Sequence, residues 1–208
     1  MFDFILNNKQ KFNRMLNSTS HAIMLEGSDT ILSSYLAKIM AMNFCCQNSD
    51  KPCGICSRCI KINNNNSLDT FIYPKKSQLL IDDVTEILEN INIIPAENQF
   101  KVIIINNFDE ANLILQNKLL KSIEEPPKFV KFILTVSSKL KVIPTIVSRC
   151  EVLTLPKFTN LELSPLVDYL PDEEKQVLLE STHGSLTLLD KIKSENNFLD
   201  NYNLAIKY

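Results

Sequence analysis

Short apolar runs separated by amphipathic segments are the dominant pattern along this chain. A run of apolar residues without alternating polar ones is typical of a strand that is buried on both faces of a parallel sheet. The clearest run is "KVIIIN", which holds four successive β-branched residues. The predicted strands are residues 21–25, 70–74, 101–106, 131–136 and 151–155.

Between these runs, apolar residues recur at helical spacing. In "IDDVTEILENINI", for example, Ile81, Val84, Leu88 and Ile91 fall on one helical face. The predicted helices are residues 3–17, 31–45, 81–93, 109–123 and 143–149. Strands alternate with helices up to about Pro156, which predicts an α/β fold with a parallel sheet.

The strand pattern ends at "PKFTN", and the residues beyond this stretch are helical in character. Pro171 and Gly184 interrupt this part of the chain and predict three or four short helices over residues 160–208. We therefore predict two domains: an α/β domain over residues 1–157, and a helical domain over 158–208.

Composition and charge narrow the classes of function. The chain is 45% hydrophobic and 22% charged, which is ordinary for a globular protein, and its net charge is -2. With no overall basic character, any contact with nucleic acid has to be local or shared with partners. No apolar run approaches 18 residues and the N-terminal segment lacks the features of a signal peptide, so we expect a cytoplasmic protein without membrane contact.

Five of the six cysteines lie within "CCQNSDKPCGICSRC". Cys53, Cys56 and Cys59 form two overlapping CxxC units, a spacing that turns thiolates toward one metal ion, and Gly54 permits the tight turn. A fourth ligand would come from Cys45 or Cys46. Free buried thiols and a redox CxxC are the alternatives, but the third cysteine has no role in a redox pair. We predict a structural zinc site in a module at about residues 45–60, because four protein ligands leave no open position for catalysis.

Residues 21–41 are predicted to form a strand, a turn and a helix, which is the order of elements around a phosphate-binding loop. The residues that bind phosphate in such a loop are missing. A working loop, GxxxxGK[ST], wraps phosphates with backbone N–H groups and neutralises them with its lysine. After Gly27, the second glycine is replaced by Leu32 and the lysine by Ser33, and Asp29 adds a negative charge. Taken without its context, the segment is better explained as an ordinary strand–turn–helix.

The strand at residues 101–106 shows a second departure. An acidic residue that holds Mg²⁺ would be expected at its end, but Asn106 and Asn107 stand there. Asp109 and Glu110 lie farther on, where we expect them to cap the next helix. The two departures together predict that the chain does not hydrolyse nucleotide.

Three stretches carry a resemblance to a known family: "NKLLKSIEEPP" (117–127), "KFILTVSSKLKVIPTIVSRC" (131–150) and the cysteine cluster. They resemble the bacterial clamp-loader subunits of DNA polymerase III, over residues 1 to about 190. The resemblance implies an AAA+ α/β domain, a small helical lid and a helical collar domain that builds a ring. In that family the gamma/tau subunits bind ATP and the delta-prime subunit can lack the phosphate loop, so the degenerate loop makes this chain look like delta-prime.

The resemblance also implies roles for particular residues. Arg149 of "SRC" matches the arginine finger that reaches a neighbouring subunit's ATP, in trans. Alignment with the family helix places the fourth zinc ligand at Cys46, which gives the set Cys46, Cys53, Cys56 and Cys59. The family's lid motif reads Gly-Ser-x-Gly-Arg, and the stretch that begins at Gly184 lacks its arginine. We therefore expect no bound ATP and no enzymatic activity. The chain ends within or just after the lid, so we expect the collar domain to be missing.

The implied partners are gamma/tau and delta subunits, the sliding clamp and, through the complex, primed DNA. Two other functions stay open. One is a gamma/tau-like active AAA+ ATPase with an unusual loop. The other is a zinc-dependent DNA-binding module, for which Lys128, Lys131, Lys139 and Lys141 would supply a modest basic surface.

Overall fold

The computed structural model describes residues 2–194, which divide into two compact units at Leu155 and Pro156. The first unit is built on a five-stranded sheet with the strand order β2-β3-β4-β1-β5. All neighbouring strands are parallel. The strands are β1 (Ala22–Glu26), β2 (Thr70–Tyr73), β3 (Lys101–Ile105), β4 (Val130–Val136) and β5 (Glu151–Thr154). Each of the five apolar runs in the sequence forms one of these strands.

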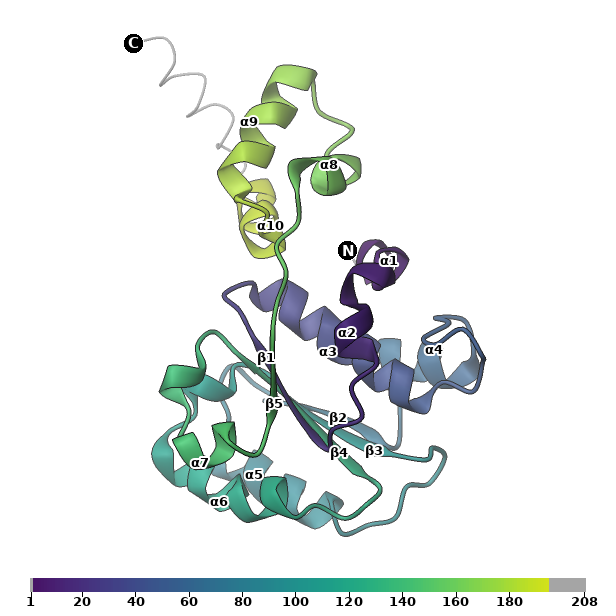
Figure 1. The fold of residues 1–208 in the computed structure, drawn as a ribbon, viewed down its shortest axis with the longest axis vertical. Helices are drawn as coiled ribbons and strands as arrows, with labels where there is room; N and C mark the ends of the chain where they lie inside the picture. The colour runs from purple at the N-terminus through teal and green to yellow at the C-terminus, as the bar shows by residue number, and fades with distance from the viewer. Residues whose placement is uncertain (1, 195–208) are drawn as a thin grey trace. The chain divides into compact units, whose positions relative to one another are not determined.

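Helices cover both faces of this sheet, as the unbroken apolar strands require. Figure 1 shows α3 (Thr30–Cys45) on one face, with α1 (Phe2–Asn7), α2 (Asn13–Leu16) and α4 (Ser57–Asn63) beside it. The other face carries α5 (Ile81–Asn90), α6 (Leu113–Glu124) and α7 (Pro144–Val147). The core on that face joins strand residues such as Ile103 and Phe132 to Val84, Leu119 and Ile146 from these three helices.

Two predicted helices are interrupted. Residues 3–17 form α1, a 3-10 turn η1 (Lys9–Phe12) and α2, because the side chain of Asn8 donates to the carbonyl of Phe4 at 2.8 Å and ends the first helix. Residues 109–123 begin as a 3-10 turn η2 (Phe108–Glu110) after Asn107, whose φ of 50° is left-handed. Helix α6 starts only at Leu113, and Asn112 caps it by accepting from Leu115 N at 3.0 Å.

The second unit is helical within its described part. It contains α8 (Asn160–Leu163), the 3-10 turn η4 (Ser164–Leu166), α9 (Asp172–Thr182) and α10 (Leu186–Ser194). His183 and Gly184 both have positive φ, and they turn the chain between α9 and α10. Gly184 also packs closely on the carbonyl oxygen of Phe158, so that a Cβ there would lie 2.1 Å from it. The residues predicted to be helical beyond Ser194 lie outside the described part of the chain.

Glu151 ties the segment before β1 to the edge strand β5. Its carboxylate accepts from the hydroxyls of Ser18 at 2.5 Å and Ser20 at 2.6 Å. These two hydrogen bonds favour the charged form and lower the pKa of Glu151 below its ordinary value of 4.5, although burial opposes them.

We predict that Glu151 contributes to the acid sensitivity of the protein. Because its pKa is lower in the folded state, its contribution is present above the unfolded pKa and is lost as the pH falls through the folded value. Glu151→Gln should therefore flatten the loss of unfolding free energy below about pH 4.5, as measured by urea unfolding at several pH values. An unchanged pH profile would show that the two hydroxyl contacts do not stabilise the carboxylate.

Candidate functional site

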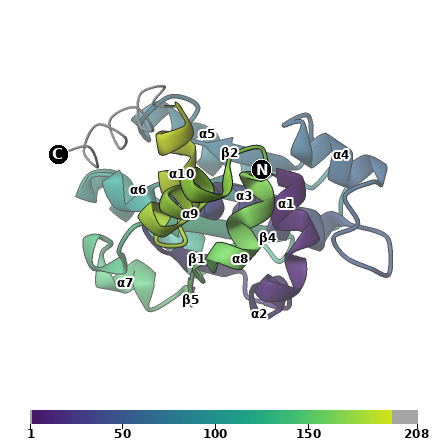
Figure 2. The ribbon, with the colours of Figure 1, turned by 90° about the horizontal axis from the view of Figure 1, so that it is seen from above.

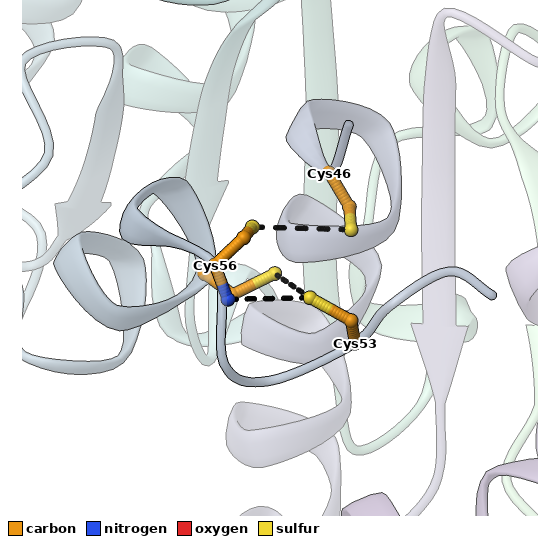
Figure 3. A group of neighbouring side chains, drawn as sticks. Cys46, Cys53 and Cys56 are labelled. Atoms are coloured by element: carbon orange, nitrogen blue, oxygen red, sulfur yellow. Dashed lines mark hydrogen bonds between the residues drawn. The ribbon is translucent and has the colours of Figure 1, made fainter. Parts of the chain in front are cut away.

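The cysteine cluster lies where the end of α3 meets the start of α4. Cys46 follows the last residue of α3, Cys56 precedes α4, and Cys59 lies in its first turn. Cys53 comes from the loop between the two helices, as Figure 3 shows, and its sulfur lies with those of Cys46 and Cys56. The sulfur atoms of Cys46, Cys53, Cys56 and Cys59 all lie within 4.8 Å of one another.

The spacing of these sulfurs fits a tetrahedral metal. The Sγ atoms of Cys46 and Cys56 are 4.0 Å apart, and those of Cys53 and Cys59 are 3.9 Å apart. Zinc bound to four thiolates at about 2.3 Å holds its sulfurs about 3.8 Å from each other. The donor set is entirely thiol, which suits zinc. With four protein ligands a bound ion would be structural, since no position is left for substrate.

The loop around the cluster favours the thiolate of Cys53, whereas burial raises the pKa of Cys59. The N–H of Cys56 donates to Cys53 Sγ at 3.3 Å. Burial opposes ionisation of Cys53, but backbone N–H groups of Cys56 and Ile55 stabilise the thiolate, and the pKa of Cys53 falls to about 6. Gly54, with φ of 73°, allows this turn, and a Cβ there would lie 2.6 Å from Leu6 Cδ2.

Cys45 lies outside the cluster. It is the last residue of α3, and its thiol points to the carbonyl of Phe100 at 3.9 Å. Burial, followed by the charge of Asp69, raises the pKa of Cys45 to about 12. The helix register therefore decides which of the two adjacent cysteines can join the other three. Cys150 is far along the chain, beside Arg149, and burial likewise raises its pKa to about 12.

A buried aspartate anchors the loop that packs against this module. Asp69, only 1% exposed, accepts hydrogen bonds from the backbone N–H groups of residues 96, 97 and 98 at 2.7–2.8 Å. Arg58 of α4 donates to the carbonyls of Cys45 at 3.3 Å and Glu97 at 2.7 Å. Lys61 adds an ion pair to Glu97. The module is thus fixed to the α/β unit by polar contacts that its cysteine spacing does not reveal.

The loop after β1 differs from a phosphate loop in structure as well as in sequence. The carboxylate of Asp29 accepts from Leu32 N at 2.9 Å and so occupies the N-terminus of α3 with its own charge. Ser33 is buried, with 3% of its surface exposed, and donates to the carbonyl of Thr30. The residues here do not supply the lysine that would hold a triphosphate, because Ser33 stands at its position.

Gly27 is needed in this loop for packing. A Cβ at this position would lie 2.8 Å from Leu155 Cδ1 and 2.9 Å from Leu155 Cβ. We predict that Gly27→Ala lowers the free energy of unfolding by about 1–3 kcal/mol, because Leu155 Cβ is attached to the backbone and cannot move away freely. Urea unfolding would measure this. Leu155→Gly removes the Cβ that the new methyl group would meet, so Gly27→Ala combined with Leu155→Gly should lose less than the sum of the single changes, and strict additivity would contradict the proposed collision.

The carboxyl ends of β3 and β4 are joined by Asp109. Its carboxylate accepts from the N–H of Ser137 at 3.1 Å and from the Ser137 hydroxyl, and Lys141 Nζ lies 3.7 Å away. The expectation that Asp109 caps the following helix is wrong, because Asn112 holds that place and the turn η2 directs Asp109 toward β4. Asn107 N donates to Thr135 Oγ1 at 3.0 Å, which ties the same two strand ends together.

Arg149 lies in the turn between α7 and β5. Its Nη1 donates to the carbonyl of Thr145 at 2.8 Å, and its Nη2 forms an ion pair with Glu124. About a third of the side chain is exposed. Figure 2 shows α7 and α4 at opposite sides of the first unit, so Arg149 and the cysteine cluster are separate features.

The lysines proposed as a basic surface do not form one set. Lys131 is buried and donates to the carbonyls of Thr19 at 2.6 Å and Ser20 at 3.0 Å, and burial lowers its pKa. Lys139 pairs with Glu26 at 3.2 Å, and Lys141 approaches Asp109. Because Lys131 is buried against backbone carbonyls, it cannot belong to an exposed basic surface, which leaves Lys128, Lys139 and Lys141 of the proposed set. Over residues 2–194, no helix combines the length and apolar character needed to cross a bilayer.

The fold defines the class of protein. A Thermotoga maritima protein described as related to the gamma subunit of DNA polymerase III has a similar structure, with a TM-score of 0.54 and 19% identity over 82% of this chain and 49% of that one. The Holliday junction branch migration motor RuvB from Thermotoga maritima gives a TM-score of 0.56 at 13% identity, over 93% of this chain and 59% of that one. The first unit thus shares the α/β fold of these two proteins.

The sequence comparison identifies the family. The model of the family described as DNA polymerase III, delta subunit, matches residues 6–159, and the chain belongs to this family. Curated relatives include the tau subunit of Escherichia coli, 28% identical over 184 residues, and the gamma/tau subunit of Mycoplasma genitalium, 34% identical over 187. The gamma subunit of Buchnera aphidicola from Baizongia pistaciae is 33% identical over 138 residues.

The chain spans only part of these relatives. The alignments cover 82%, 82% and 65% of this chain, but 28%, 30% and 37% of the Escherichia coli, Mycoplasma and Buchnera proteins. The family match over residues 6–159 includes the cysteine cluster and Arg149.

Three predictions need correction in light of these relatives. The expectation that the chain is not an enzyme is contradicted, because its curated relatives are gamma and tau subunits, the subunits that bind ATP within this family. The specific resemblance to delta-prime, and the expected absence of ATP that followed from it, lose their support for the same reason. These expectations rested on two local features, the missing lysine and the missing carboxylate, and neither outweighs the family match over residues 6–159.

Proposed function

We propose that this chain is a gamma/tau-like subunit of the clamp loader of DNA polymerase III. The observation that carries the proposal is the family match over residues 6–159, with relatives that include gamma and tau subunits from several bacteria. Its partners would be further gamma/tau and delta subunits and the sliding clamp, and it would meet primed DNA through the complex. The second unit, from Pro156 onward, would serve as the helical lid.

Within such a complex, Arg149 would act on the nucleotide of a neighbouring subunit. Phosphoryl transfer spreads negative charge over the equatorial oxygens of the transferring group, and a guanidinium supplied in trans stabilises that charge. The exposure of Arg149 at the end of α7 supports this role. Because the finger serves the neighbour's nucleotide, this role does not depend on the residues of the chain's own loop.

The cysteine cluster would hold zinc through Cys46, Cys53, Cys56 and Cys59. The ion would cross-link the end of α3 to the start of α4. Since the four thiols occupy every position of a tetrahedral ion, its contribution would be to stability and to the shape of this surface.

Reconstitution tests the proposed function. The full chain is mixed with the delta subunit, an ATP-competent gamma-type subunit and the sliding clamp of the same organism. Size-exclusion chromatography then measures assembly, and ATP turnover is measured with and without primed DNA. We expect the chain to co-elute with the other subunits and DNA-stimulated turnover to require it. Failure to assemble, or equal turnover without the chain, would rule out a clamp-loader role.

A further inference from the structure

Glu124 stands at a position that helix electrostatics disfavours. It is the last residue of α6, and Glu125 follows it as the C-cap. The C-terminal end of a helix carries a partial negative charge, which disfavours carboxylates there by about 0.3–1 kcal/mol each. Two successive acidic residues at this end therefore call for a specific partner.

The partner of Glu124 is Arg149. The carboxylate pairs with Nη2, while Nη1 of the same guanidinium donates to the carbonyl of Thr145 at 2.8 Å and reaches Ser148 Oγ at 3.5 Å. Both terminal nitrogens thus have partners, and these contacts restrict the orientation of the guanidinium. A guanidinium has five N–H donors, so these three contacts leave donors for a phosphate.

Buried contacts fix the distance between the two elements that carry this pair. Gln116 of α6 is 1% exposed, and its Oε1 accepts from the N–H of Ile143, just before α7, at 2.9 Å. Its Nε2 donates to the carbonyls of Ala111 at 2.8 Å and Lys141 at 3.3 Å. Ile146 of α7 is fully buried in the core that α6 also lines. The ion pair is therefore built on a rigid base.

Stability alone gives little reason for the pair. The side chains of Arg149 and Glu124 are 33% and 40% exposed, and ion pairs with this exposure contribute about 0–1 kcal/mol. A fixed orientation of the arginine, in contrast, affects catalysis directly, because a finger that is already oriented loses less entropy when it binds the transferring phosphoryl group.

We propose that Glu124 is the positioning residue of Arg149. It orients the guanidinium before the neighbouring subunit's nucleotide arrives, and it acts only through the arginine. This proposal rests on the proposed function of Arg149 as a finger.

A double-mutant cycle in the reconstituted complex tests this role. Relative to wild type, Glu124→Ala should lower the stimulated kcat on the order of tenfold, because misorientation by about an ångström has effects of up to a hundredfold. The KM for ATP should stay within about twofold. Glu124→Gln, which keeps an acceptor without the charge, should give an intermediate value. In the Arg149→Ala background, Glu124→Ala should have no further effect.

Glu125→Gln is the matched control, since it removes one charge from the same helix end without touching the ion pair, and it should leave kcat unchanged. Thermal unfolding of each variant checks the fold, and Glu124→Gln carries the test if Glu124→Ala does not fold. A kcat that stays equal or rises in the Glu124 variants, or effects of Glu124 and Arg149 that add, would overturn the positioning role. If Arg149→Ala itself has no effect, the finger proposal fails and this one with it. If Arg149→Ala lowers kcat and the Glu124 variants do not, the finger proposal stands and the positioning proposal fails.

Discussion

Replacement of Cys59 by serine is expected to abolish tight binding of zinc and to loosen the module between α3 and α4. Cys59 is fully buried, and its sulfur lies 3.9 Å from that of Cys53. Without it, three thiols and a hydroxyl remain, and the hydroxyl is a much poorer ligand for zinc than a thiolate. Wild-type protein should bind one zinc ion per chain, and Cys59→Ser should bind less than about a tenth of that after dialysis.

The effect on stability should be large as well. An ion that binds only the folded state stabilises it by about 4 kcal/mol when its free concentration is a thousandfold above the dissociation constant. We therefore expect wild-type protein to lose about this much unfolding free energy in a chelator, and Cys59→Ser to be insensitive to the chelator. Elemental analysis gives the zinc content, and urea unfolding with and without chelator gives the free energies.

Cys45→Ala is the matched control, because Cys45 is adjacent to a proposed ligand in sequence but directs its thiol toward Phe100. It should keep one zinc per chain and the full response to chelator. Loss of zinc in Cys45→Ala, with full binding in Cys46→Ala, would assign the fourth ligand to the other cysteine. Wild-type protein without zinc, even when expressed and purified with added zinc, would refute the metal site.

Replacement of Arg149 by alanine is expected to lower ATP turnover by about 10³-fold or more. The turnover meant is that of the neighbouring subunit in the assembled complex, at the interface that this chain forms with it. The guanidinium would be the charge closest to the neighbour's transferring phosphoryl group, and nothing else in the turn replaces it. Arg149→Lys should recover only a small part of the activity, since an ammonium cannot keep both the Glu124 and the Thr145 contact and also bind phosphate in the same way.

The measurement is single-turnover hydrolysis in a complex where only the neighbour of this chain can bind ATP, so that other interfaces do not mask the effect. Lys121→Ala is the control, because it removes a positive charge from the last turn of α6 without touching the turn that holds Arg149. Assembly must be unchanged in each variant, as judged by size exclusion. Full activity of an assembled Arg149→Ala complex would refute the finger.

The apolar pattern was sufficient to predict the sheet. Each of the five strands lies within two residues of its predicted bounds, because a strand buried on both faces needs an unbroken apolar run. Helix ends were less predictable. Asn8 and Asn107 divide or delay helices by local hydrogen bonding and backbone conformation, and such effects depend on the neighbours that these residues meet.

The polar contacts around the sites depended on tertiary structure. Asp69, Gln116 and Glu124 lie far in sequence from Ala96, Ile143 and Arg149, the partners that give them their roles here, so no local spacing identifies them. One signal was present for Glu124, namely a carboxylate at the unfavourable end of a helix, but only the structure shows its partner.

The sequence by itself determined that this chain forms a parallel α/β sheet, that its cysteines have the spacing of a metal site, and that its loop after the first strand lacks a lysine. These are local properties, set by periodicity and by the residue types at a few positions. Only the tertiary structure decided that Cys46 and not Cys45 joins the cluster, that Gly27 is required by Leu155, and that Arg149 is held by Glu124. In each case the deciding contact is made by groups that chain folding brings together, and its energy depends on distances that the order of residues does not contain.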